Sequence, residues 1–191
     1  MKNKSLFKLF VVSSIFLFIS GCAFGNRRPC LTYTPFSSSQ PGNNITLRVI
    51  PFEDSRQFKD TVGYSRNGFG MPCAKVIPQN SVTEWVTSAL KLELTNAGYN
   101  TSEQEDVSDV IEGEVLDIFC DTYMSYEGRA MLKVVLKKDG KVILDKNYSA
   151  NKTGGINWAA TASSFAKTLD ETLQDVLRQV VFDINKELLE K

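Results

Sequence analysis

Two glutamates and four cysteines are the side chains whose types and spacing could do chemistry in this chain. Glu112 and Glu114 alternate along an expected strand, so both point to one side, where a pair of carboxylates could act in glycoside hydrolysis. Arg129 and Lys133 on a neighbouring strand favour a structural ion network instead. Histidine, the commonest general base, is absent from the sequence. We therefore expect no catalytic residues and no enzyme activity.

The cysteines suit a covalent role better than a metal site. Cys30, Cys73 and Cys120 are separated by 43 and 47 residues, and without histidine this spacing predicts no metal site. Three disulfide pairings are open to them, as is a state with three free thiols. We favour a disulfide between Cys30 and Cys73, because both lie in Pro-flanked, loop-like stretches. Cys120 would then be a buried strand thiol.

The fourth cysteine, Cys22, ends a short apolar segment at the N-terminus. Three lysines precede a mostly apolar stretch from Leu9 to Ile19, about half of the ~20 apolar residues that a transmembrane helix needs. A basic start, a short apolar centre and small residues at the exit are typical of a secretory signal. We therefore expect residues 1–21 to be a signal peptide that is removed.

The quartet "ISGC", residues 19 to 22, resembles the lipobox of bacterial lipoproteins. That resemblance implies cleavage before Cys22, a thioether-linked diacylglycerol on its sulfur and a further acyl chain, of the palmitate type, on its new amino group. Two or three acyl chains hold a protein firmly on a membrane. An ordinary signal peptide followed by an unrelated cysteine is the alternative.

The mature chain would have 170 residues, a length that suits one domain with a sizeable core. With the signal removed, 19 basic and 22 acidic residues remain, a balance that predicts no nucleic-acid binding. The segment before residue 45 contains "TPFSSSQPGNN", which is rich in Ser, Pro, Gly and Asn. We therefore expect a lipidated N-terminus with a flexible tether over 22–44 and a single domain over 45–191.

The expected domain contains four main strands and two helices. The strands cover residues 45–52, 108–120, 127–137 and 141–149. The first helix begins at a capping box of Ser81 and Glu84 and ends at Gly98. The second helix, over 160–186, has an apolar residue every three or four positions. Asp139 and Gly140 predict a hairpin turn between the last two strands.

Charge supports antiparallel pairing of the second and third strands. Residues 103–121 include eight acidic and no basic residues, whereas residues 129–146 include six basic and two acidic ones. Opposite charges that face each other across strands stabilise a sheet by roughly 0.2–1 kcal/mol per pair. The order β-α-β-β-β-α then predicts an α+β fold, a mixed, mainly antiparallel sheet with two helices packed on one face.

Several of these stretches resemble one family. "SALKLELTNAGY" (88–99), "DGKVILDKNYSANKTGG" (139–155) and the long final helix are similar to the YajG-type lipoproteins of bacterial envelopes. The resemblance covers about 110 residues and implies no catalytic residues. Similar small domains occur in auxiliary lipoproteins of envelope lipid transporters and in flagellum-associated lipoproteins. The resemblance therefore predicts the fold but not a specific function.

One loop has the composition of a binding surface. Tyr64, Arg66, Phe69 and Met71 combine aromatic, arginine and methionine side chains, which are enriched where protein surfaces make their strongest contacts. This loop is a candidate site for an envelope protein partner, and a loop folded back over its own sheet is the equally open alternative. A free edge strand is a second candidate surface, although lysines near the hairpin at residues 137–141 could block it.

We therefore expect a lipid-anchored envelope lipoprotein, a non-catalytic accessory or binding component of an envelope complex for transport or motility. Direct binding of a lipid or glycan is the alternative. Ala23 follows the lipidated cysteine and, by analogy with enteric bacteria, favours the periplasmic face of the outer membrane. The covalent lipid on Cys22 is the only cofactor expected, and the sequence sets no oligomeric state.

Overall fold

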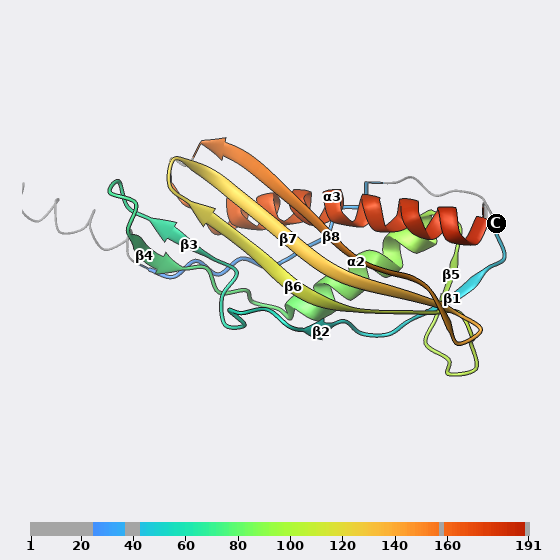
Figure 1. The fold of residues 1–191 in the computed structure, drawn as a ribbon. Helices are drawn as coiled ribbons and strands as arrows, with labels where there is room; N and C mark the ends of the chain where they lie inside the picture. The colour runs from blue at the N-terminus through green and yellow to red at the C-terminus, as the bar shows by residue number, and fades with distance from the viewer. Residues whose placement is uncertain (1–24, 37–42, 157–158, 190–191) are drawn as a thin grey trace, which may run out of the picture.

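The computed structural model describes residues 25–36, 43–156 and 159–189. They form a mixed sheet with two helices on one face, so the predicted α+β class is confirmed (Figure 1). The elements are β1 (Thr46–Val49), β2 (Glu53–Asp54), β3 (Gly63–Arg66), β4 (Pro72–Lys75), α2 (Val82–Asn96), β5 (Asn100–Ser102), β6 (Val110–Thr122), β7 (Ser125–Lys138), β8 (Lys141–Ile156) and α3 (Ala162–Leu189). The expected signal peptide and Cys22 lie outside the described residues.

Strand β6 is the centre of the sheet. β7 pairs with one edge of β6, and β8 pairs with β7, both antiparallel and over long ladders. β1, β2 and β3 follow one another along the other edge of β6, each parallel to it. β5 extends the sheet beyond β1, and β4 extends it beyond β3. The expected order β-α-β-β-β-α is present, but four short strands lie in segments that we expected to be loops.

Local signals set the ends of α2 and the turn between β7 and β8. The Ser81 hydroxyl accepts a hydrogen bond from Glu84 N at 3.2 Å, as the capping box predicts. Gly98 follows the helix with a φ of 90°, a left-handed conformation that glycine adopts readily. Asp139 and Gly140 have φ values of 49° and 74°, which suit the predicted tight hairpin turn.

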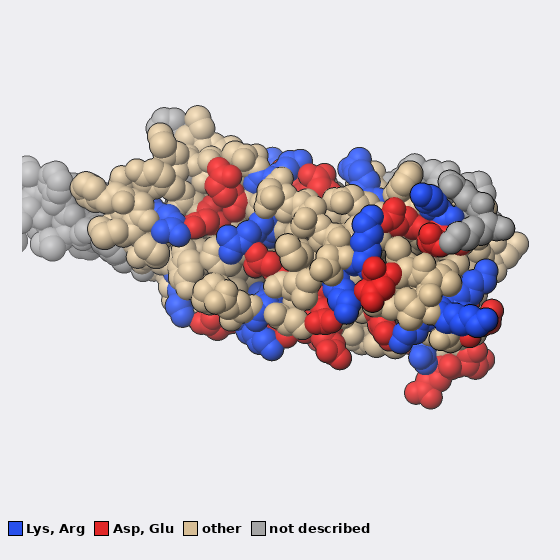
Figure 2. Space-filling view, in the orientation of Figure 1, with Lys and Arg blue, Asp and Glu red and all other residues tan. Residues whose placement is uncertain are grey.

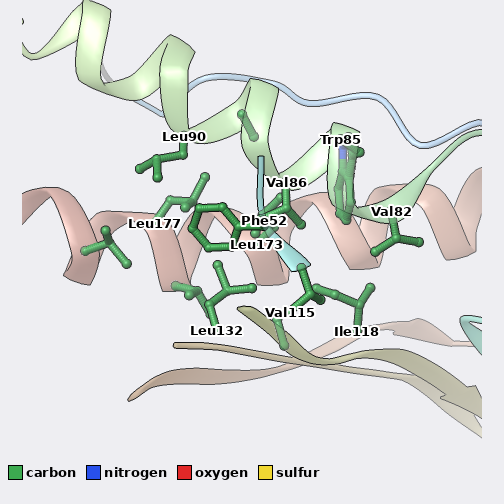
Figure 3. Packing of buried hydrophobic residues seen from close by; sticks show 14 of the residues in the cluster. Phe52, Val82, Trp85, Val86, Leu90, Val115, Ile118, Leu132, Leu173 and Leu177 are labelled. Carbon is green, nitrogen blue, oxygen red and sulfur yellow. The ribbon is translucent and has the colours of Figure 1, made fainter. Parts of the chain in front are cut away.

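The hydrophobic core fills the space between the sheet and the helices. Val115 of β6, Leu132 of β7 and Leu173 of α3 meet there and are fully buried (Figure 3). Burying one such side chain contributes about 1.5–3 kcal/mol. At Gly128 of β7 a Cβ atom would collide with the Thr172 hydroxyl of α3. Glycine therefore lets the helix approach the sheet closely on this face, while the opposite face stays open.

Residues 25–36 form a segment that we call the strap, which starts beside β4 and continues onto the helices. Arg27 pairs with Val76 in parallel, and its backbone N donates to the Lys75 carbonyl at 2.8 Å. The Arg27 guanidinium donates to the Ala160 carbonyl, just before α3, at 2.6 Å. Leu31 is buried in the core.

Two buried carboxylates hold the second half of the strap. Glu93 of α2 accepts hydrogen bonds from the Tyr33 hydroxyl at 2.8 Å and from Phe36 N at 2.9 Å. Asp170 of α3 accepts a hydrogen bond from Thr34 N at 3.1 Å. Both carboxylates are shielded from solvent. Because a buried polar group needs hydrogen-bond partners, the donors of the strap also stabilise these two carboxylates.

The strap corrects our expectation of a flexible tether over residues 22–44. Although the segment is polar overall, three of its apolar side chains, Leu31, Tyr33 and Phe36, pack with the core. Its backbone groups find hydrogen-bond partners on the helices, which a solvated linker would not need. The domain therefore begins before residue 45, and the described part of the chain resumes at residue 43, where Asn43 N donates to the Gly98 carbonyl at 2.9 Å.

Candidate functional site

The open face of the sheet carries the two glutamates that could have formed an acid pair. Three cross-strand ion pairs lie there, Glu112–Lys137, Glu114–Lys133 and Arg129–Asp117. The Lys133 to Glu114 distance is 3.7 Å, and Ser55 also donates a hydrogen bond to Glu114 at 2.7 Å. A hollow of about 260 Å³ opens beside Glu112 and Glu114. Each glutamate is thus engaged by a lysine. Lys133 is one of the two partners that we expected, whereas the other, Arg129, pairs with Asp117 instead.

Two further properties concern the whole described part of the chain. Within residues 25–36, 43–156 and 159–189, no group of three or more histidine, cysteine, aspartate or glutamate side chains is arranged to hold a metal ion. Over the same residues, no helix is both long enough and apolar enough to cross a membrane.

The loop expected to bind a partner folds into the β3–β4 hairpin. Asn67 shapes its turn, because the side-chain oxygen accepts hydrogen bonds from Phe69 N at 3.0 Å and Met71 N at 3.1 Å. Tyr64 of β3 packs against Phe119 of β6 with ring centroids 5.7 Å apart. Phe69 and Met71 contrast with Tyr64, because their side chains are 89% and 57% exposed at the turn.

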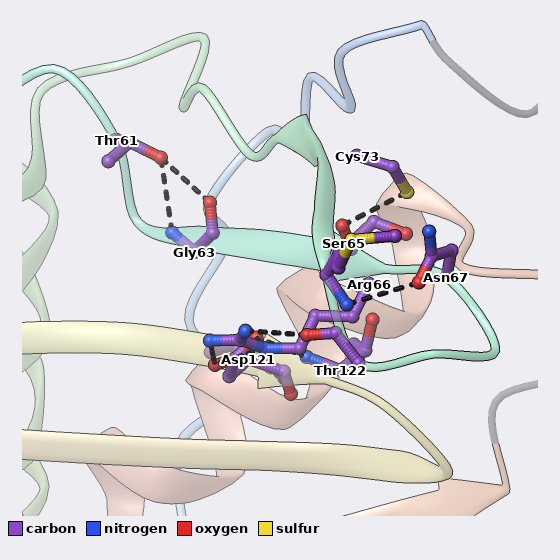
Figure 4. A network of polar contacts seen from close by, with 11 residues as sticks. Thr61, Gly63, Ser65, Arg66, Asn67, Cys73, Asp121 and Thr122 are labelled. Atoms are coloured by element: carbon purple, nitrogen blue, oxygen red, sulfur yellow. Dashed lines mark hydrogen bonds and ion pairs between the residues drawn. The ribbon is translucent and has the colours of Figure 1, made fainter.

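Arg66 fastens this hairpin to the central strand. Its guanidinium makes a two-pronged contact with the Asp121 carboxylate at 2.6 to 2.9 Å and also donates to the Gly70 carbonyl at 2.8 Å (Figure 4). Hydrogen bonding to Asp121 raises the pKa of Arg66 above its usual value. Of the four residues expected to contact a partner, Tyr64 and Arg66 therefore attach the hairpin to its own sheet, as the alternative predicted.

Exposed apolar side chains from three segments meet at this end of the molecule. The Tyr123 hydroxyl, in the turn between β6 and β7, donates to the Gly68 carbonyl of the β3–β4 turn at 3.1 Å. Ser125, next to that turn, pairs with Ile156 at the end of β8. We call the exposed apolar residues here the tip; they are Phe69, Met71, Tyr123, Met124 and Ile156.

Sequence reasoning found Phe69 and Met71 and missed the other three tip residues. Tyr123 and Met124 sit in a five-residue uncharged stretch, 122–126, between acidic strand residues. Ile156 is the last residue of the edge strand β8, and the sequence pattern of this strand did not predict a binding surface. The available signal was the lack of charge in three segments that are remote in sequence, and only the sheet pairing shows that these segments meet.

The three described cysteines are free thiols, so the expected Cys30–Cys73 disulfide is not formed. The strap runs parallel to β4 with Arg27 level with Val76. Continued in this register, Cys30 lies about six residues beyond the level of Cys73, roughly 20 Å along extended chain. Disulfide-bonded cysteines have Cα atoms within about 7 Å, and this separation explains the difference.

Cys120 is the buried strand thiol that we expected. It is fully buried in β6, and burial, with smaller effects of Asp121 and Glu127, raises the pKa of its thiol to about 12. Cys73 is half-buried and donates a hydrogen bond to the Ser65 carbonyl at 3.2 Å. A raised pKa disfavours the reactive thiolate of Cys120.

The family comparison agrees with the sequence resemblance. A family model described as uncharacterized lipoprotein, Lipoprotein_16, matches residues 34–188, and it confirms the likeness to the YajG-type lipoproteins. A search of curated proteins found no match.

Solved structures show the same fold at low sequence identity. A protein from Xanthomonas campestris is 13% identical with a TM-score of 0.56, covering 81% of this chain and 91% of its own. A hypothetical protein from Chlamydia trachomatis is 10% identical with a TM-score of 0.51, covering 78% and 100%. A minor lipoprotein from Acinetobacter baumannii is 13% identical with a TM-score of 0.44, covering 73% and 91%. The first two share a fold with this chain.

Proposed function

The chain belongs to this family of bacterial lipoproteins, and on that premise we propose that it is a non-catalytic accessory or binding component of an envelope complex for transport or motility. A lipid on Cys22 anchors it, and Ala23 directs it to the periplasmic face of the outer membrane. The lipobox-like quartet and the family match support the anchor.

The observation that carries the accessory role is the free edge of β8. This strand has 16 residues, and among the described strands it pairs with β7 alone. A long free edge can accept a partner strand through backbone hydrogen bonds. Part of it is protected, because Gln179 of α3 donates to the Ser149 carbonyl at 3.2 Å, and Lys146 and Lys152 lie along it, a feature that discourages non-specific pairing.

The alternative, direct binding of a lipid or glycan, has less support from the packing. Such a ligand was expected in an apolar cavity between the helices and the sheet. Phe52, Leu132 and Leu177 fill that space with close side-chain contacts (Figure 3). The ion pairs of the open face likewise support a structural role for Glu112 and Glu114 rather than hydrolysis.

Photo-crosslinking in intact cells tests the accessory role. A photoreactive residue replaces Asn147, which is exposed on β8, and the matched control replaces Glu105, which is exposed in the loop between β5 and β6. We expect one envelope complex to be captured from position 147 only, and to be lost when Cys22→Ser removes the anchor. Capture of the same abundant envelope proteins from both positions would contradict an accessory role.

A further inference from the structure

The tip gathers exposed apolar side chains from three neighbouring segments at one end of the molecule. Phe69, Met124 and Ile156 come from three different segments, and their side chains are 89%, 73% and 69% exposed. The Tyr123–Gly68 hydrogen bond and the pairing of Ser125 with Ile156 hold the segments together. Contiguous exposed apolar surface on a folded domain indicates contact with another apolar phase.

Charged side chains are absent from the segments that build the tip and are frequent at the opposite end of the domain. Residues 67–74, 122–126 and 153–156, which build the tip, contain no charged side chain. The opposite end differs, because the turn joining β7 to β8 contains Lys138, Asp139 and Lys141, and residues 103–109 add four carboxylates. In Figure 2 the end of the molecule that carries β3 and β4 is mostly tan, whereas charged side chains are scattered over the rest of the visible face.

The strap fixes where a lipid on Cys22 can lie. Gly25 stands two residues before Arg27, whose parallel pairing with Val76 places Gly25 level with Ala74 of β4. Lys75 N also donates to the Asn26 side chain at 3.1 Å. Cys22 is three residues from Gly25, a distance of at most about 11 Å. The acyl chains are therefore confined to the end of the domain that carries the tip.

We propose that the tip rests on the lipid bilayer, with its apolar side chains inserted among the lipids next to the anchor. This inference rests on the proposed function, because it takes Cys22 to be acylated. Aromatic and aliphatic side chains gain free energy when the hydrocarbon boundary covers them. The uncharged segments around them can approach the bilayer without desolvating an ion.

This contact orients the whole domain. The long strands β6, β7 and β8 run from the tip toward the β7–β8 turn, which lies at the far end (Figure 1). The bilayer then holds the domain by two points, the anchor and the tip, instead of by one flexible connection. The open face and the free edge of β8 consequently stand out from the membrane rather than against it.

A fluorescence quenching experiment on the acylated full chain tests the proposal. An environment-sensitive dye is attached at position 69 through Phe69→Cys, or at position 142 through Val142→Cys as the matched control. Val142 is an exposed residue of β8 opposite Lys137, at the far end. Both proteins carry Cys30→Ser and Cys73→Ser, and they are reconstituted in vesicles of phosphatidylethanolamine and phosphatidylglycerol, with or without lipids brominated on their acyl chains.

We expect the dye at position 69 to shift its emission to the blue and to lose most of its intensity with brominated lipids, while the dye at position 142 does neither. Equal quenching at both positions, or at neither, in an acylated chain would overturn the proposal; an unquenched tip would point to a protein partner there. Mass spectrometry of the same samples reports the acyl chains separately. A chain without acyl mass would overturn the anchor, and with it the tip contact.

A second variant needs no dye. In the acylated chain, Phe69→Ser with Met124→Ser is compared with Val142→Ser with Phe182→Ser, which removes two apolar side chains elsewhere that are 55% and 66% exposed. Extraction from the vesicles by mild detergent should become easier only for the tip variant, by roughly tenfold in the detergent-to-lipid partition. Equal extraction of both variants would contradict an inserted tip, and circular dichroism confirms that both are folded.

Discussion

Replacing Tyr33 by phenylalanine tests how firmly the strap is held on the helices. The change removes one hydroxyl, which donates at 2.8 Å to the fully buried Glu93 carboxylate, and keeps the aromatic ring. A hydrogen bond to a charged group contributes about 1.5–3 kcal/mol. Phe36 N still donates to the same carboxylate oxygen, so the strap should stay docked and the loss should fall within that range. For a domain of this size the expected drop in Tm is about 5 °C.

Two assays measure this effect in a chain of residues 22–191 with Cys22→Ser. Thermal unfolding gives the change in stability, and limited trypsin digestion between Arg27 and Arg28 gives the opening of the strap, which should become faster. Tyr123→Phe is the control, because its hydroxyl donates to a neutral carbonyl at the surface and should contribute about 0.5 kcal/mol. If Tyr33→Phe were as stable as the native chain and no more easily cut, the carboxylate would not be holding the strap.

Three further predictions follow from burial and close packing. Burial is the main reason that the pKa values of Tyr33 and Tyr99 are raised, the latter to about 12. Because unfolded tyrosines ionise near pH 10, the unfolding free energy should fall as the pH rises from 10 to 12. The midpoint of urea unfolding measures this fall. An alkylating reagent at pH 8 should modify the exposed Cys30 quickly and Cys120 only after unfolding, as followed by mass spectrometry. Gly128→Ala should lower stability by about 1–3 kcal/mol in urea unfolding, because the new methyl group collides with α3.

Each of these has a matched control. The alkaline fall in stability should be shallower in Tyr33→Phe, and an identical fall would contradict the buried-hydroxyl explanation. Rapid modification of Cys120 in the folded chain would contradict its burial in β6. Gly155→Ala is the control for Gly128→Ala, because a Cβ at position 155 meets nothing within 4 Å. Equal stability of the two alanine variants would refute close packing at Gly128.

The parts of the fold that depend on local signals could be predicted from the sequence. Ser81 and Gly98 set the ends of α2, and the Asp139–Gly140 turn joins β7 to β8 as expected. The sequence did not predict the register shift that follows between Leu136 and Lys137. The segregation of acidic and basic residues predicted the ladder of β6 with β7, since opposite charges stabilise facing positions. β1 was predicted within residues 45–52, whereas β2, β3, β4 and β5 were missed, because a strand of two to four residues has little periodicity of its own.

The strap and the tip depend on contacts between residues that are remote in sequence, and for these segments the amino-acid composition led to wrong or incomplete predictions. The strap has the residues of a linker, yet Tyr33 and Thr34 bind carboxylates on helices that form much later in the chain. The favoured disulfide failed for the same reason, because the strap register separates Cys30 from Cys73. Phe69 could be selected from the composition of its loop. Ile156 could not, because only the pairing of β8 with β7 shows that it lies at the tip.

The strap also sets the order in which the domain can fold. Its contacts join residues far apart in the chain: Arg27 with Ala160 over 133 positions, and Thr34 with Asp170 over 136. The N-terminus leaves a ribosome or a translocation channel first, so the strap cannot dock until nearly the whole chain has followed it. Contacts with such large sequence separation are slow to form. The strap is therefore expected to stay undocked until α2 and α3 have been synthesised, and its docking on these helices is the step that closes the domain.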